Sequence, residues 1–115
     1  MGEEIRYKFR EDELIDEIKR YIDKTYEQHY SSEEDPNAVQ PLELWAKHPL
    51  RGVFGGLKDV VKYADRYGTK EGFNRSDILK IIHYGLFALY CHDRLMEQNE
   101  NVREKTLNEI VKQDH

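Results

Sequence analysis

Apolar and aromatic residues recur at helical spacing in the first third of the chain. Three acidic residues, Glu11 to Glu13, precede them, and negative charge at a helix N-terminus is stabilised by the helix dipole. The pattern predicts a helix that begins near Asp12 and ends before the polar loop from His29 to Asn37. Its apolar positions are Leu14, Ile18, Tyr21, Ile22 and Tyr26.

Two shorter segments lie on either side of this helix. Residues 1–10 alternate apolar with charged side chains, a period of two that predicts a short extended N-terminal arm or a single strand. Beyond the loop, Pro41 suits the first turn of a short helix, residues 42–47, which Pro49 then stops.

Two further helices are predicted in the second half of the chain. The first is entered around Gly52–Gly56 and runs to Tyr67, with Gly68 where a left-handed C-cap residue is expected. The glycines at its entry favour a kink or a close contact with another helix. One face of this helix is apolar and comprises Phe54, Leu57, Val60, Val61, Ala64 and Tyr67.

The next helix is predicted to run from Ser76, as its N-cap, to about Glu97. Because its apolar residues lie nearly all round, we expect it to be central and buried on most sides. The polar residues 98–101 predict a break, after which residues 101–115 form an amphipathic C-terminal segment.

These elements predict one compact all-α domain, residues 1–115, of about four to five helices with a short extended N-terminal arm. Eight Tyr and four Phe argue against a disordered chain.

The net charge of −5 argues against general nucleic-acid binding. No apolar run is long enough to cross a membrane, and the start lacks a signal peptide. The single cysteine, Cys91, fits a reducing, cytoplasmic setting.

Candidate chemistry lies on the polar face of the helix that ends at Tyr67. Asp59, Lys62, Tyr63 and Arg66 are spaced i, i+3, i+4 and i+7, so they project from one side within two turns. Lysine offers a point charge, arginine offers planar donors, and tyrosine offers a stacking face, so the set resembles a phosphate clamp. Ordinary solvated helix faces are the alternative interpretation.

The following helix repeats this combination, with one more cation in the intervening loop. If the two helices pack antiparallel, the two polar faces line one cleft. The residues concerned are Lys70 in the loop and Asp77, Lys80 and Tyr84 in the helix.

Other chemistry is less well supported by the spacing of residues. His83 and His92 lie on opposite helix faces, and no zinc-binding spacing occurs. The dipeptide His92-Asp93 is similar to the metal-binding pair of HD-type phosphohydrolases but lacks their further ligands. Cys91 is interpreted as a packed core thiol. The glycines at 52–56 lack the Gly-Lys-Ser/Thr ending of a phosphate-binding loop.

Four short motifs occur in an order and spacing that resemble a family of small, podovirus-type phage proteins regarded as P-loop-free nucleotide kinases. The resemblance covers residues 29 to about 90. Asp59 stands where that family usually has Asn, and four residues rather than two separate Gly72 from Asp77. The motifs are His29-Tyr30, Gln40-Pro41-Leu42-Glu43, Asp59-x-x-Lys62-Tyr63-x-x-Arg66-x-x-x-Lys70-x-Gly72 and Asp77-x-x-Lys80-x-x-x-Tyr84.

The resemblance implies helical oligomers that bind nucleotides, and it suggests roles for the matching residues. A kinase would move a phosphoryl group from ATP or another nucleoside triphosphate, with magnesium as a candidate cofactor, to a deoxynucleoside monophosphate. Glu43, Asp59 and Asp77 would orient the acceptor or a metal, and Tyr63 or Tyr84 would stack a base. The remaining substrate-binding candidates are His29, Tyr30, Lys62, Arg66, Lys70 and Lys80.

Two other functions remain open from the sequence. The same clamp would serve a non-catalytic viral oligomer that sequesters a signalling nucleotide in the host cytoplasm. Alternatively, the chain is a helical interaction module, whose charged faces are solvated and whose C-terminal segment mediates assembly.

Overall fold

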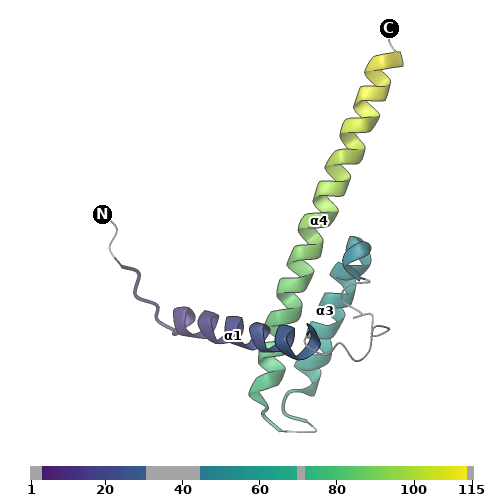
Figure 1. Cartoon of the computed structure of the whole chain (residues 1–115). Helices are drawn as coiled ribbons and strands as arrows, with labels where there is room; N and C mark the ends of the chain where they lie inside the picture. Colours follow the sequence, from purple (N-terminus) through teal and green to yellow (C-terminus); the bar gives the residue numbers. More distant parts are fainter. Residues whose placement is uncertain (1–3, 31–44, 70–71, 114–115) are drawn as a thin grey trace. The chain divides into compact units, whose positions relative to one another are not determined.

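The computed structural model describes residues 4–30, 45–69 and 72–113. The described residues are predominantly helical, which confirms the all-α class predicted from the sequence (Figure 1). The chain divides into two compact units, Met1–Ala38 and Val39–His115, and each is considered by itself. Among the described residues, β pairing is limited to an isolated bridge between Thr69 and Gly72.

The first unit contains helix α1, Glu11–Tyr30. It begins within one residue of the predicted start and carries the expected acidic first turn. The Arg10 Nε lies 2.6 Å from Glu13 Oε2, and the Phe9 amide donates to Glu11 Oε1 at 2.6 Å, so the helix start is held by local contacts. Residues 4–10, within the predicted arm, form neither helix nor strand.

Helix α3, Pro49–Arg66, begins earlier than predicted. Pro49 occupies the start of this helix, because proline has no amide hydrogen to leave unpaired there. The expected entry at 52–56 is therefore helix interior. The described part of the predicted short helix, residues 45–47, is helical and ends before His48 and Pro49, as predicted. The predicted end is confirmed, since Tyr67 is the C-cap and Gly68 has the left-handed φ of 85°.

Helix α4, Arg75–Gln113, is a single uninterrupted helix of 39 residues. Its N-terminus is capped by Asn74, whose Oδ1 accepts a hydrogen bond from the Ser76 amide at 3.0 Å, so the prediction of Ser76 as the cap was wrong. The predicted break at 98–101 is also absent. Those residues are polar, but none is Gly or Pro, and polarity alone does not interrupt a helix.

Helices α3 and α4 pack antiparallel as a hairpin (Figure 1). Gly52 lies against Cys91, and Gly56 lies against Ala88, so contacts run in opposite order along the two helices. A Cβ on Gly56 would lie only 3.1 Å from the Ala88 Cβ, and one on Gly52 would overlap the Cys91 Sγ. The glycines therefore provide the close helix contact that their spacing suggested.

The structure corrects which helix surfaces are buried. The face of α3 that packs on α4 carries Gly52, Gly56 and half-buried Tyr63, whereas Phe54 and Leu57 of the predicted apolar face are 66% and 48% exposed. Helix α4 was predicted to be buried on most sides, but it also exposes an apolar stripe along its length. Cys91 is fully buried, as expected of a core thiol. None of the described helices meets the length and hydropathy needed to span a membrane.

Candidate functional site

The hairpin brings together polar faces from both helices around a pair of tyrosines. Tyr63 of α3 and Tyr84 of α4 stack with ring centroids 5.7 Å apart and ring planes 13° from parallel. The Lys80 Nζ lies 5.0 Å and the Lys62 Nζ 5.4 Å from the centre of the Tyr63 ring. Both distances are within the range of cation–π attraction, so the ring holds two positive charges close together.

One turn further along the hairpin, an ion pair joins the two helices. The Arg66 Nε lies 3.9 Å from the Asp77 Oδ1, and Asp77 is only 1% exposed. Asp77 lies in the first turn of α4, where the helix dipole stabilises a carboxylate. Because Asp77 is closed off from solvent, its geometry favours a positioning role over direct contact with a ligand.

A pocket of about 370 Å³ opens beside these residues. It is lined by Lys62, Asp65, Arg66 and Thr69, and Thr69 is fixed because its hydroxyl donates to the Arg66 carbonyl at 2.6 Å. Pockets of this size accommodate small ligands. Two cations and one carboxylate in the lining suit a ligand with both an anionic group and a hydrogen-bond donor.

Six of the residues predicted from the sequence thus come together in the hairpin. The sequence predicted a shared cleft on the condition that the two helices pack antiparallel, and they do. Asp59 lies half-buried on α3, one turn before Tyr63. The six residues are Lys62, Tyr63, Arg66, Asp77, Lys80 and Tyr84.

The other four predicted residues remain untested. Glu43 and Lys70 lie outside the described residues. His29 and Tyr30 form the last turn of α1, in the other unit, and their side chains are also outside the described part. Their proposed roles as catalytic or substrate-binding groups stay predictions.

The tyrosine contacts change the role expected for these rings. A free aromatic face was expected to stack a base, but Tyr63 already contacts a second ring and two ammonium groups. Tyr84 contacts Tyr63 and, at 6.2 Å between centroids, His83. The contacts hold Lys62 and Lys80 beside the Tyr63 ring, and stacking of a base on either tyrosine stays a prediction.

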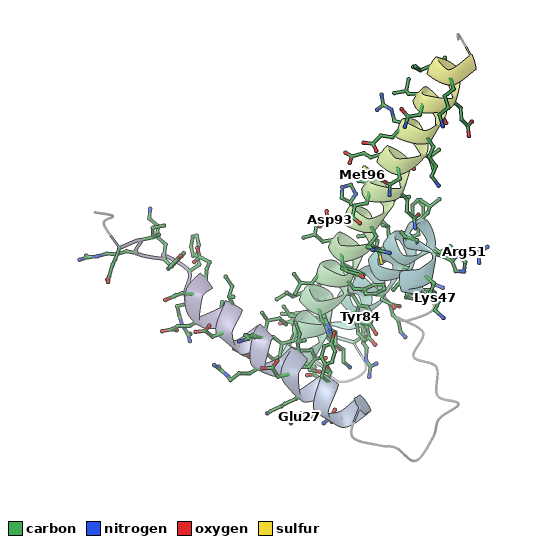
Figure 2. The ribbon with its side chains drawn as sticks, turned by 45° about the horizontal axis from the view of Figure 1, so that its top comes forward. Glu27, Lys47, Arg51, Tyr84, Asp93 and Met96 are labelled. Carbon is green, nitrogen blue, oxygen red and sulfur yellow. The ribbon has the colours of Figure 1, made fainter. Side chains whose placement is uncertain are left out.

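Sequence reasoning missed two features of the surface. It assigned no role to Asp65 or Thr69, although both lie within one turn of Arg66. It also missed a second pocket, of about 300 Å³, at the start of α3. Lys47 and Arg51 flank that pocket and project outward from the hairpin (Figure 2). Basic residues on both sides of His48-Pro49 were the available signal.

His83 is half-buried beside Tyr84, and loss of solvation lowers its pKa below the ordinary value of 6.5. The unfolded chain therefore binds a proton at a higher pH than the folded chain does. Among the described residues, no group of three histidine, cysteine or acidic side chains is arranged to hold a metal ion.

This shift predicts a pH-dependent stability. The contribution of His83 is present above pH 6.5 and is lost as the pH falls from 6.5 through the lower pKa of the folded state. We expect His83→Gln to flatten the pH dependence of the free energy of unfolding in that window, measured by urea titration. An unchanged slope in His83→Gln, compared with the unaltered chain at the same protein concentration, would contradict this prediction.

Comparisons with known proteins identify no relative. No protein-family model, curated protein or solved structure matches the chain.

Proposed function

We propose that the chain binds a nucleotide through the surface formed by Lys62, Arg66 and Lys80. The observation that carries this proposal is that Lys62 and Lys80, from two helices, meet at the Tyr63 ring, and that Lys62 and Arg66 line the open pocket beside it. A phosphate group is the common biological anion that such a mixed lysine and arginine surface recognises.

The pocket supplies complementary chemistry for the rest of the ligand. The Asp65 carboxylate would repel phosphate, but it accepts hydrogen bonds from a hydroxyl or an amino group. A nucleotide carries both an anionic phosphate and such donors on its sugar or base. Lys62 is exposed and can move toward a ligand, whereas Arg66 is held near Asp77.

Within this proposal, phosphoryl transfer to a deoxynucleoside monophosphate is the specific activity suggested by the family resemblance. It would require a nucleoside triphosphate donor such as ATP. Lys62, Arg66 and Lys80 would neutralise phosphate charge, Asp59 would orient the acceptor, and Asp77 would position Arg66. Since the described residues lack a three-ligand metal site, magnesium would enter with the nucleotide phosphates if the reaction uses it.

Binding is tested first, by calorimetry and thermal shift with deoxynucleoside monophosphates, ATP and cyclic dinucleotides. A nucleotide at 100 times its Kd should raise the free energy of unfolding by about 2.7 kcal/mol, because it binds only the folded state. We expect Lys62→Ala and Lys80→Ala each to weaken binding about tenfold, the value of one charge-assisted hydrogen bond.

Lys105→Ala is the matched control, since this exposed lysine lies 25 positions beyond Lys80 on α4, about 37 Å away. Product analysis then separates two outcomes. Formation of a diphosphate from a monophosphate and ATP indicates a kinase, while recovery of an unchanged ligand indicates a sequestering protein. Absence of binding to every nucleotide would overturn the proposal and leave the interaction module.

That second candidate, a helical interaction module, is favoured by a separate observation. The hairpin exposes large apolar side chains on both helices, and contiguous exposed apolar surface is typical of an interaction site.

A further inference from the structure

The hairpin carries an exposed apolar face made of two stripes, one on each helix. Within each stripe, the residues are three or four positions apart, so they lie on one side of their helix. Exposures range from 41% for Ile82 to 66% for Phe54. The apolar face comprises Leu50, Phe54, Leu57 and Val61 of α3 and Ile78, Ile82, Leu86 and Leu89 of α4.

Helical geometry places both stripes on the same side of the hairpin. On α3 the stripe is rotated about 100–160° from Gly56, which faces α4, at 100° per residue. On α4 the stripe is rotated about 120–200° in the same sense from Tyr84, which faces α3. Because the helices are antiparallel, equal rotations bring the stripes to one side. Lys62 and Arg66 are rotated in the opposite sense and lie on the other side.

A second exposed surface belongs to the C-terminal part of α4. Gly52 is level with Cys91, and the pocket at Pro49 reaches Gln98, so residues 99–113 extend beyond the start of α3 (Figure 1). This extension of 15 residues is about 22 Å long. Its large apolar side chains are more than half exposed and are Val102, Leu107, Ile110 and Val111.

The two surfaces are joined by one seam along α4. Starting at Ile78, positions spaced alternately four and three apart lie on the side of the helix that carries the apolar stripe. This is the spacing of a helix that packs along another helix, and five of the ten positions are apolar: Ile78, Ile82, Leu89, Met96 and Ile110. Met96, at the centre of the seam, projects from the side of α4 away from α3 (Figure 2). The positions are Ile78, Ile82, Gly85, Leu89, His92, Met96, Asn99, Arg103, Thr106 and Ile110.

The order of these spacings is the same when read from either end. Reversing the seam about residue 94 places Ile78 opposite Ile110 and Leu89 opposite Asn99. An antiparallel pair of α4 helices therefore keeps its seam positions in register over the whole length. Reversal about residue 94 places residues 99–113 opposite residues 75–89 of the partner α4, so the extension covers the α4 stripe and the end of the α3 stripe that carries Leu57 and Val61. The Leu50 end of the α3 stripe, level with residues beyond Cys91, lies opposite the central part of the partner α4.

We propose that the chain forms a two-fold symmetric dimer in which the α4 helices pair antiparallel and each extension, residues 99–113, covers the apolar face of the partner. A second copy is the occupant because this arrangement covers both exposed surfaces at once, in a closed and reciprocal way. A parallel pair would place the two extensions against each other and leave both apolar faces open. The Lys62–Lys80 surface lies on the other side and stays accessible.

Disulfide trapping tests the orientation. The double variant Ile78→Cys with Ile110→Cys should form a covalent dimer under mild oxidation, seen on a non-reducing gel. The two positions are about 48 Å apart on one helix, so a bridge can form only between chains. Native Cys91 is fully buried, and burial raises the pKa of its thiol, so it contributes no competing bridge.

The single variants Ile78→Cys and Ile110→Cys are the matched controls and should remain uncross-linked. Cross-linking by either one alone would show a parallel pair and overturn the proposal. The proposal would also be overturned if the double variant did not cross-link and light scattering gave a mass of 13.8 kDa. That result would indicate that another part of the same chain covers the apolar face.

Charge substitution tests the contact itself. The unaltered chain should have twice the mass of 13.8 kDa, and Leu107→Glu with Ile110→Glu should return it to 13.8 kDa at micromolar concentration. Lys105→Glu changes the net charge by the same two units on the opposite side of α4 and should stay dimeric. A dimer that survives the double substitution contradicts the proposal. Nucleotide binding by these variants is a separate readout, so the two proposals can fail independently.

Discussion

Replacing Gly52 by alanine should lower the free energy of unfolding by about 1–3 kcal/mol, as over-packing of a tight contact does. The added Cβ would overlap the Cys91 Sγ and lie 2.9 Å from the Trp45 carbonyl oxygen. Alanine also favours the helix over glycine by up to about 1 kcal/mol. The steric penalty outweighs this gain because Cys91 is fully buried in the hairpin and has no room to withdraw.

Gly85 provides a matched control on the partner helix. Nothing lies within 4 Å of a Cβ built at this position, so Gly85→Ala should raise the free energy of unfolding by about 0.5–1 kcal/mol. Because Gly85 is also a position of the proposed α4 seam, both variants are measured by urea unfolding at a protein concentration at which the chain is monomeric. If Gly52→Ala stabilised the chain to the same extent as Gly85→Ala, the close packing of the hairpin would be contradicted.

A second substitution identifies the contact that is responsible. Adding Cys91→Ala to Gly52→Ala removes the sulfur atom and should recover part of the lost stability. Recovery stays partial, because the Trp45 carbonyl oxygen and the side-chain Cβ at position 91, 3.2 Å from the added methyl, remain in place. If no stability were recovered, the steric strain in Gly52→Ala would arise from a contact other than the one with the Cys91 sulfur.

Helix positions were predictable because they depend on local chemistry. The acidic first turn of α1 and the left-handed Gly68 are local signals, and both agree with the structure. The start of α3 was misplaced because Pro49 is compatible both with ending a helix and with beginning one. The continuity of α4 was missed because a polar run resembles a loop in a hydrophobicity pattern.

The face on which α3 packs was not predictable from hydrophobicity. A periodic pattern identifies the apolar side of a helix, but here the buried side carries Gly52 and Gly56, and Phe54 is exposed. Close approach of two backbones, with stacked tyrosines and an ion pair, determines the rotation of α3 about its axis. These contacts join residues distant in the sequence, so no local pattern reveals them. The apolar side of α3 is therefore exposed on the hairpin, and this exposed apolar surface suggests contact with a partner molecule.

The residues of the candidate site were likewise predictable on each helix separately, but their contacts between the helices were not. Spacing on each helix correctly grouped Lys62 with Arg66 and Lys80 with Tyr84. Their meeting depended on antiparallel packing, which the sequence offered only as a condition. The burial of Asp77 was not visible in the spacing, because it results from contact with α3. The structure thus separates exposed cations suited to binding from a buried carboxylate suited to positioning.

Arg66→Met should lower the free energy of unfolding by about 2–3 kcal/mol, because it leaves the buried Asp77 carboxylate without its cation. We place the loss below the range for fully buried pairs, since the Arg66 side chain is 34% exposed and the closest pair of atoms is 3.9 Å apart. Asp77→Asn should cost less, because the arginine that remains can turn toward water.

The double variant Arg66→Met with Asp77→Asn distinguishes the contribution of the ion pair to stability from the loss of side-chain packing. Once the buried charge is removed, losing the arginine has less effect, so the double variant should be about as stable as Asp77→Asn alone. The coupling in this cycle should reach at least about 1 kcal/mol, as for residues in direct contact. Simple additivity would mean that the pair contributes nothing and that Arg66 is free to act as a ligand-binding group. Strong coupling instead means that Asp77 holds Arg66 in place as a fixed charge at the pocket, whereas Lys62 and Lys80 can move toward a ligand.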